Sequence, residues 1–269
     1  MKTIASVAEI AAAKEYEDNH VAAEFRQWTP LMLEAAQIHS DDRVLDVACG
    51  TGVLAREAVL SVGEGGYVAG LDTDPGRLAV AASLAPSIDW RAGVAESLPF
   101  DDESFDAVVC QFGLMFFQDR AAALREMLRV LVPGGRVAVA VRDSLERSGA
   151  YSVEVELFER FAGESAAAAL RTPFVLSDKA KLAELFRDAG TDSVKVVTHR
   201  GTSRFPSIRA MVETDLRSWL PTMGVVLGED VIQAILAESE AALGEFLTDE
   251  GMFEFDAPAH IVTGAKLLM

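Results

Sequence analysis

The chain has 269 residues, half of them apolar and a quarter charged, which is typical of a globular protein large enough to bury a substantial core. Its formal net charge of −18 argues against nucleic acid as the main partner, because binding a polyanion needs a basic surface. The chain has two cysteines, Cys49 and Cys110, and no Cys/His cluster, so we expect neither a disulfide framework nor a metal site.

The N-terminal segment, residues 1–18, is predicted as a helix. Its short apolar stretch is interrupted by Glu9 and preceded only by Lys2, which is unlike a secretory signal peptide. No run in the sequence approaches the roughly 20 apolar residues that span a bilayer. We therefore expect a cytoplasmic protein without a membrane span.

Residues 43–141 alternate short β-branched runs with amphipathic helical stretches. The predicted strands are 43–47, 67–72, 88–92, 105–111 and 136–141. The predicted helices are 53–62, ended by Gly63, then 75–85, begun by Asp74 and Pro75, and 120–131, capped by Asp119. Pro133-Gly134-Gly135 is predicted to turn the chain into the last strand. This alternation predicts a doubly wound α/β sheet.

After residue 141 the pattern changes to helix and loop. Ser177 is predicted to cap a helix that ends at Ala189, and two strands are predicted at 194–205 and 253–266. About fifty helical residues separate these strands, which indicates a C-terminal antiparallel hairpin whose connection has grown into a helical lid. The expected organisation is an N-terminal helical cap (1–40), a core (41–206 and 251–269) and a lid insertion (207–250).

A glycine-rich turn, Gly50-Thr51-Gly52, follows the first predicted strand. With the next three residues it fits the G-x-G-x-x-A fingerprint of dinucleotide-binding proteins, and Asp72 lies twenty residues beyond Gly52. A dinucleotide would place its pyrophosphate over this turn, where Asp46 would repel it. S-adenosylmethionine instead brings an ammonium and a sulfonium, which a carboxylate attracts. No Lys or Arg in the turn neutralises a phosphate, so the charges favour S-adenosylmethionine.

Five blocks carry a resemblance to a known family. They are Val44-Leu45-Asp46-Val47-Ala48-Cys49-Gly50-Thr51-Gly52, Gly70-Leu71-Asp72-Thr73-Asp74, Ala95-Glu96-Ser97-Leu98-Pro99-Phe100, Ser104-Phe105-Asp106-Ala107-Val108 and Arg129-Val130-Leu131-Val132-Pro133-Gly134-Gly135. In this order they resemble the class I S-adenosylmethionine-dependent methyltransferases, in particular the branch with the ubiquinone/menaquinone-biosynthesis C-methyltransferases. The resemblance implies a seven-stranded Rossmann-like sheet.

The resemblance also implies cofactor-binding residues. They are Asp46, Ala48, Gly50, Gly52, Asp72, Thr73, Leu78, Ala95, Glu96 and Gln111. Asp46 and the backbone of the glycine turn would hold the methionine end, with the carbonyl of Gln111 facing its amino group. Asp72 would accept hydrogen bonds from both ribose hydroxyls. Thr73 and Leu78 would flank the adenine, and the backbone at Ala95 would meet its polar edge.

Two positions need a separate interpretation. Many relatives have an acid before the Ala-Glu pair, but this sequence has Val94. The adenine amine then donates its hydrogen bond to backbone, water or Glu96, or cofactor affinity is lowered, at a cost of about 1 kcal/mol for a net hydrogen bond.

Cys49 is interpreted as a packing residue rather than a nucleophile, because no histidine is near it in sequence.

The acceptor side is less determined. His20 is the best candidate for a general base, because relatives fold the segment 16–28 over the cofactor; the alternative is a structural histidine. The candidate residues of an apolar substrate pocket are Phe25, Trp28, Met115, Leu216 and Trp219. The alternative is that these side chains pack the lid against the sheet.

The sequence therefore predicts a methyltransferase that uses S-adenosylmethionine and methylates a small or medium-sized, partly hydrophobic acceptor by in-line displacement. Two alternatives stay open. One is a module that binds the cofactor without turnover. The other is a nicotinamide-dependent oxidoreductase on the same architecture.

Overall fold

The computed structural model describes residues 5–268 and divides into two compact units. The first unit takes in Met1–Val141, Leu176–His199 and His260–Met269, and the second takes in Arg142–Val175 and Arg200–Ala259. The expected cap segment thus belongs to the first unit. The second unit is larger than the expected lid, because 142–175, 200–206 and 251–259 join 207–250 in it.

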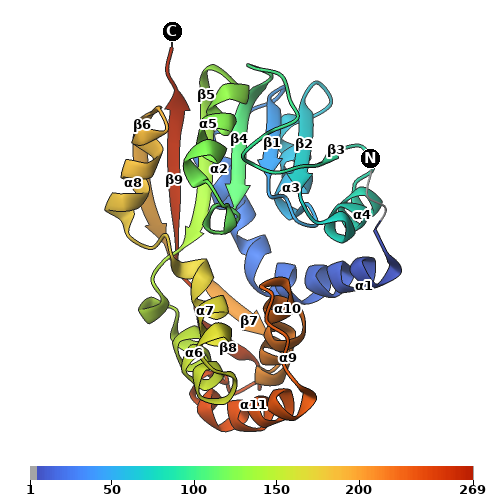
Figure 1. The fold of residues 1–269 in the computed structure, drawn as a ribbon. Coiled ribbons are helices and arrows are strands. Elements are labelled where there is room, and N and C mark those ends of the chain that lie inside the picture. The colour runs from blue at the N-terminus through green and yellow to red at the C-terminus, as the bar shows by residue number, and fades with distance from the viewer. Residues whose placement is uncertain (1–4, 269) are drawn as a thin grey trace. The chain divides into compact units, whose positions relative to one another are not determined.

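A seven-stranded sheet forms the centre of the first unit, as the sequence predicted (Figure 1). Its strands are β1 (Arg43–Val47), β2 (Tyr67–Asp72), β3 (Asp89–Ala92), β4 (Phe105–Gln111), β5 (Leu131–Arg142), β6 (Thr191–His199) and β9 (Ala259–Lys266). Their order is β3-β2-β1-β4-β5-β9-β6. The pairs among β1 to β5 are parallel, whereas β9 runs in the opposite direction to its neighbours.

The order in which strands are added to the sheet reverses at β1, although the strands themselves stay parallel. From β1 the chain proceeds through β2 to β3 on one side, and β4 begins the other side. Because crossovers between parallel strands are right-handed, this reversal puts helices on both faces of the sheet. The helices are α2 (Thr29–Ala35), α3 (Val53–Val62) and α4 (Pro75–Leu84) before the reversal, and α5 (Arg120–Val130) and α8 (Lys179–Asp188) after it. A reversal of this kind leaves a crevice at the carboxyl ends of the two central strands.

The segment before the sheet is helical. It comprises α1 (Val7–Tyr16), the π-helical turns η1 (Glu17–Phe25), a short 3₁₀ turn η2 (Arg26–Trp28) and α2. Ser6 and Glu9 form a capping box that begins α1. The predicted N-terminal helix is therefore confirmed from residue 7 onward, and residues 1–4 lie outside the described part of the chain.

The second unit is mostly helical and has its own two-stranded sheet. Its elements are η4 (Leu145–Arg147), α6 (Gly149–Ala162), α7 (Glu164–Arg171), η5 (Thr172–Phe174), β7 (Thr202–Phe205), α9 (Ile208–Thr214), η6 (Asp215–Trp219), α10 (Leu220–Thr222), α11 (Glu229–Ala242), η7 (Gly244–Phe246) and β8 (Phe253–Asp256). β7 and β8 pair antiparallel. Aromatic rings fill its core, among them the edge-to-face pair Tyr151–Phe255 at 5.3 Å between centroids.

Two predicted strands are each divided in the structure. The predicted strand 194–205 is β6 and β7, and the predicted strand 253–266 is β8 and β9. Gly201 interrupts the first and Ala257-Pro258 the second, so β6 and β9 join the large sheet while β7 and β8 form the small one. Apolar residues alternate without a break across the second interruption, from Phe253 through Ala257 to Ile261, whereas the first lies in a short polar stretch that has no strong break signal except Gly201.

The cap of α8 and the turn before the fifth predicted strand differ from the prediction. The cap of α8 is Asp178 rather than Ser177, because the Asp178 carboxylate accepts hydrogen bonds from Ala180 N and Lys181 N. The predicted turn at Pro133-Gly134-Gly135 lies within β5, which begins at Leu131 and meets β4 with a shift in register.

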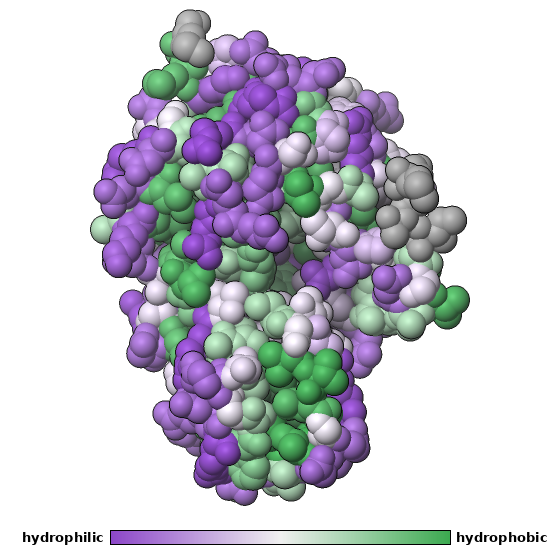
Figure 2. Space-filling view, viewed as in Figure 1, coloured by the Kyte–Doolittle hydropathy of each residue, from purple (hydrophilic) through white to green (hydrophobic). Residues whose placement is uncertain are grey.

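The surface is largely hydrophilic on the face seen in Figure 2, and an apolar area lies over the helices α9 and α11 of the second unit. Within residues 5–268, every helix falls short of the length or the hydropathy that a bilayer-spanning segment requires.

Two glycines accommodate the indole of Trp90 on β3. A Cβ on Gly70, which pairs with Trp90 in the sheet, would lie 2.3 Å from the indole, and a Cβ on Gly52 would lie 2.4 Å from it. The indole itself is fixed, because its Nε1 donates to the carbonyl of Ala85 over 2.9 Å.

Gly70→Ala is therefore expected to lower the free energy of unfolding by about 1–3 kcal/mol, as overpacking does. Measured in urea, the loss should shrink in a Trp90→Leu background, where the clashing ring is absent. Gly244→Ala is the control, because a Cβ there meets no atom within 4 Å. An equal loss with and without Trp90 would contradict this account.

Candidate functional site

The candidate site lies at the carboxyl ends of β1 and β4, where the strand order reverses. Asp46 is the penultimate residue of β1 and pairs with Val109 of β4, and Gln111 ends β4. Because neighbouring parallel strands end at one edge, Asp46 and Gln111 lie at the same edge of the sheet, where folds of this kind bind ligands.

Left-handed backbone conformations concentrate at this edge. Gly50 and Gly52 have φ of +58° and +85°, and two residues with side chains, Ala48 and Phe112, have φ of 59° and 57°. A Cβ on Gly113 would lie 2.6 Å from the Cβ of Ala48, so the chain after β4 passes directly against the chain after β1. Strained residues of this kind cost about 1–3 kcal/mol each and typically occur where a ligand is held.

Asp46 is almost completely buried, with 1% of its surface exposed. Its Oδ2 accepts a hydrogen bond from Ala55 N over 3.1 Å, in the first turn of α3. Its Oδ1 is buried and has no hydrogen-bond partner among the described residues. Burial, with a smaller contribution from the charge of Asp72, raises the pKa of Asp46 to about 8. An arrangement of this kind favours a cation as a partner.

Asp72, which ends β2, also holds the glycine turn. Its Oδ2 accepts from Gly50 N over 2.7 Å, and its Oδ1 accepts from Asp74 N over 2.9 Å. A carboxylate oxygen has two acceptor positions, so each can accept a further hydrogen bond from a ligand.

Gln111 contributes a second unsatisfied acceptor. Its Nε2 donates to the carbonyl of Phe25 over 3.1 Å, which links the end of β4 to the N-terminal segment. Its Oε1 is buried without a partner in the described part of the chain. Asp46 and Gln111 therefore each present a buried oxygen that needs a donor, on two adjacent strands.

The residues predicted to surround an adenine follow β2 and β3. Thr73 is exposed, Leu78 is half-buried and Ala95 is buried. Glu96 accepts hydrogen bonds at Oε1 from the backbone amides of residues 118 and 119, so this oxygen orders the loop before α5. Val94, at the position where relatives have an acid, is 47% exposed.

The N-terminal segment lies against the glycine turn through Tyr16 and Glu17, which are not among the predicted site residues. The Tyr16 ring lies 3.9 Å from where a Cβ on Gly50 would be, and the guanidinium of Arg77 lies 4.4 Å above the ring centroid. Thr51 Oγ1 donates to Glu17 Oε2 over 2.5 Å. No sequence pattern indicates these contacts of Tyr16 and Glu17. The sequence shows only that both residues belong to the segment expected to cover the site.

His20 lies in this segment and is buried, with its ring stacked on Tyr16 at 5.9 Å between centroids. Phe25 and Trp28 both contact Phe112, each at 5.6 Å between centroids. Three predicted site residues, His20, Phe25 and Trp28, thus occur in one aromatic cluster.

The other predicted pocket residues lie elsewhere. Met115 is buried in the 3₁₀ turn η3 (Leu114–Phe116) after β4. Leu216 and Trp219 belong to the second unit, where Leu216 is buried and Trp219 Nε1 donates to the carbonyl of Ala169 over 3.1 Å. Trp219 is thus held in place by a hydrogen bond within that unit.

The two cysteines are buried, and burial raises the pKa of each thiol. A raised pKa opposes thiolate formation, which agrees with a packing role for Cys49. Among residues 5–268 no group of three or more His, Cys, Asp or Glu side chains is arranged to hold a metal ion.

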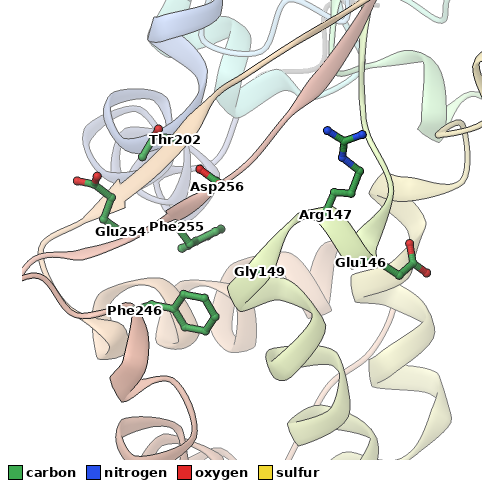
Figure 3. Close-up of a pocket in the computed structure, with 8 residues that line it drawn as sticks. All are labelled: Glu146, Arg147, Gly149, Thr202, Phe246, Glu254, Phe255 and Asp256. Atoms are coloured by element: carbon green, nitrogen blue, oxygen red, sulfur yellow. The ribbon is translucent and has the colours of Figure 1, made fainter.

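A cavity of about 500 Å³ lies in the second unit (Figure 3). It is lined by Glu146, Arg147, Gly149, Thr202, Phe246, Glu254, Phe255 and Asp256. None of the residues predicted from the sequence as site residues lines this cavity.

Comparisons with known proteins agree with the geometry of the first unit. Residues 45–139 match the family model of a methyltransferase domain. Demethylmenaquinone methyltransferase of Renibacterium salmoninarum is 44% identical over 115 residues, which covers 43% of this chain and 47% of the relative. The chloroplastic 2-phytyl-1,4-beta-naphthoquinone methyltransferase of Arabidopsis thaliana is 42% identical over 122 residues, covering 42% and 47%.

These matches confirm the resemblance to methyltransferases of the quinone-biosynthesis branch. The chain spans about half the length of the curated relatives it matches. Among solved structures, phosphoethanolamine N-methyltransferase 2 of Haemonchus contortus aligns with 96% of this chain and 57% of its own, at a TM-score of 0.60 and 16% identity. At this identity the likeness establishes a shared fold.

The buried Asp46 predicts a pH dependence of stability. In the folded protein its pKa is about 8, against 3.8 ordinarily, so between these values the folded state keeps a proton that the unfolded state has released. The free energy of unfolding should therefore fall as pH rises towards 8, by at most about 1.4 kcal/mol per pH unit from this group.

Asp46→Asn cannot ionise and should lack this contribution. Relative to the wild type, the variant's melting temperature without ligand should rise between pH 5 and pH 8. Other titrating groups are shared by both proteins and cancel in the difference. Parallel pH profiles of the two proteins would show that Asp46 does not titrate in this range.

Proposed function

We propose that this chain, which contains a methyltransferase domain at residues 45–139, binds S-adenosylmethionine at the carboxyl edge of its sheet and transfers the methyl group to a small or medium-sized, partly hydrophobic acceptor. The observation that carries this proposal is the pair of buried, unpartnered acceptors beside the glycine turn, Asp46 Oδ1 and Gln111 Oε1. The methionine end of the cofactor has an ammonium to donate and a sulfonium charge to offset.

The charge of Asp46 also distinguishes S-adenosylmethionine from a dinucleotide. A cation beside Asp46 favours its ionised form and offsets the burial that raises its pKa. A pyrophosphate there would meet a buried acid, so the nicotinamide oxidoreductase is the weaker alternative. The relatives matched over this region are named as methyltransferases, which supports the same choice.

The residues after β2 and β3 fit the adenosine end. We assign Asp72 to the ribose hydroxyls, because both its oxygens keep acceptor capacity after their bonds to Gly50 N and Asp74 N. Exposed Thr73 and half-buried Leu78 would flank the adenine, and the backbone at Ala95 would meet its edge.

The bound cofactor would supply an electrophilic methyl group: a nucleophile would attack the methyl carbon in line with the carbon–sulfur bond, and the sulfur would leave as the neutral thioether of S-adenosylhomocysteine. The chain's own contribution is to orient the donor, exclude water and hold the acceptor within reach. A reactive carbon or nitrogen acceptor needs no base from the protein, whereas a hydroxyl acceptor benefits from one. His20 is the residue we assign to that role, since it lies in the aromatic cluster of the N-terminal segment.

The acceptor is proposed at the level of its class. The two relatives are named for a demethylmenaquinone and a phytyl naphthoquinone, so a reduced naphthoquinone is the first acceptor to test. In the first unit we assign Phe25, Trp28 and Met115 to the apolar pocket that holds the acceptor. The roles of Leu216 and Trp219, like the cytoplasmic location, stay predictions from the sequence.

Asp46→Asn and Asp72→Asn are each expected to weaken binding of S-adenosylhomocysteine at least about tenfold, because each removes a charged acceptor. Calorimetry measures the affinities, and Asp101→Asn is the control, since Asp101 is exposed. Unchanged affinity in both variants would contradict the assignment. Tighter binding of NAD than of S-adenosylhomocysteine would favour the oxidoreductase.

Transfer of isotope-labelled methyl from S-adenosylmethionine to a reduced naphthoquinone or a metabolite extract tests turnover. With a hydroxyl acceptor, His20→Gln should lower kcat by about 100-fold or more, and with a carbon acceptor it should leave kcat nearly unchanged. Binding of the cofactor without transfer to any acceptor would favour the module without turnover.

A further inference from the structure

We propose that Glu17 is a positioning residue that fastens the N-terminal segment over the glycine turn and so retains the bound cofactor. This inference rests on the proposed function only for the identity of the ligand. It concerns a different part of the chain from the acceptors Asp46 and Gln111.

Glu17 makes two short polar contacts with the element that carries the glycine turn. Its Oε2 accepts from Thr51 Oγ1 over 2.5 Å, and its Oε1 accepts from Arg56 Nη2 over 2.6 Å. Arg56 in turn donates from Nε to the carbonyl of Gly52 over 3.2 Å. One carboxylate therefore joins η1 both to the middle of the turn and to the first turns of α3.

These contacts are shielded from solvent. The Glu17 side chain is 11% exposed, that of Arg56 is 23% exposed, and Thr51 is 1% exposed as a residue. An ion pair on an open surface contributes little, but hydrogen bonds to a charged group that is largely withdrawn from water are stronger and geometrically defined. The hydrogen bonds of Glu17 are of this stronger, shielded kind.

The residues before Glu17 are docked independently. α1 crosses α4 so closely that a Cβ on Gly76 would lie 2.5 Å from the carbonyl oxygen of Glu9. At the end of α1 the Tyr16 ring lies under the guanidinium of Arg77 and also close to the backbone at Gly50. Glu17 therefore completes an attachment that begins on α4 and ends on α3.

The consequence concerns the methionine end of the cofactor. With Glu17 attached, η1 is held against Thr51 of the turn that this end must contact, and the carbonyl of Phe25 at the end of η1 accepts a hydrogen bond from Gln111. Detachment of Glu17 frees η1 to move away from the turn while α1 stays on α4. The contacts of Glu17 should therefore slow the dissociation of a bound cofactor without changing the contacts that the cofactor makes once it is bound.

The test measures the association and dissociation rates of S-adenosylhomocysteine with the full chain. Glu17→Ala and Thr51→Val should each dissociate the ligand about tenfold faster, with the melting temperature of the ligand-free protein little changed. Thr51→Ser keeps the hydroxyl and should behave as the wild type. Glu15→Ala is the matched control, because Glu15 is an exposed acid two residues away in the same segment.

Hydrogen exchange of residues 7–28 provides a second measurement that needs no ligand. Glu17→Ala should lose protection in η1, whereas Glu15→Ala should not. If the wild type fails to bind S-adenosylhomocysteine, the proposed function is wrong, and this exchange measurement still tests the attachment.

Two results would overturn the proposal. Dissociation rates and exchange that do not differ between Glu17→Ala and Glu15→Ala would show that the Glu17 contacts hold nothing in place. Slower dissociation in Glu17→Ala would show the opposite role, in which Glu17 occupies a carboxylate position at Thr51 and Arg56 that the cofactor's own carboxylate takes on binding.

Discussion

The hydrogen bond from the amide of Ala55 to the buried carboxyl of Asp46 ties the end of β1 to the first turn of α3. Between these anchors the chain reverses through left-handed conformations at Ala48, Gly50 and Gly52. The reversal leaves one oxygen of Asp46 buried without a donor. An acceptor in this state destabilises the ligand-free protein, and a cationic ligand that satisfies it recovers the loss. The feature that costs stability is thus the one that favours binding.

The rest of the site is arranged around this turn. Asp72, at the end of β2, accepts from Gly50 N, and Glu17, from the N-terminal segment, accepts from Thr51. Two segments distant in sequence therefore hold one short loop. Because each contact fixes a different residue of the turn, the loop is ordered before any ligand arrives, which reduces the entropy that binding must overcome.

The sequence predicted local elements well where a strong local signal existed. The bounds of α3 and of β1, β2 and β4 agree with the structure, because Gly63 ends the helix and turn residues delimit each strand. Prediction failed where neighbours in space decided the outcome. Residues 253–266 have a continuous strand pattern, yet they pair with two different sheets. Pro133-Gly134-Gly135 has the composition of a turn, yet β4 pairs on both sides of it and makes it an irregularity within β5.

By itself the sequence determined the doubly wound sheet and the positions of Asp46, Asp72 and the glycine turn, since alternation and turn chemistry are local properties of a chain. It also determined the preference for a cation over a pyrophosphate, which follows from the sign of a charge. Only the tertiary structure decided that Asp46 is buried with an unsatisfied oxygen, and that Glu17 meets Thr51 and Arg56. Burial and contacts between distant residues depend on how all the elements pack, and no local pattern encodes them.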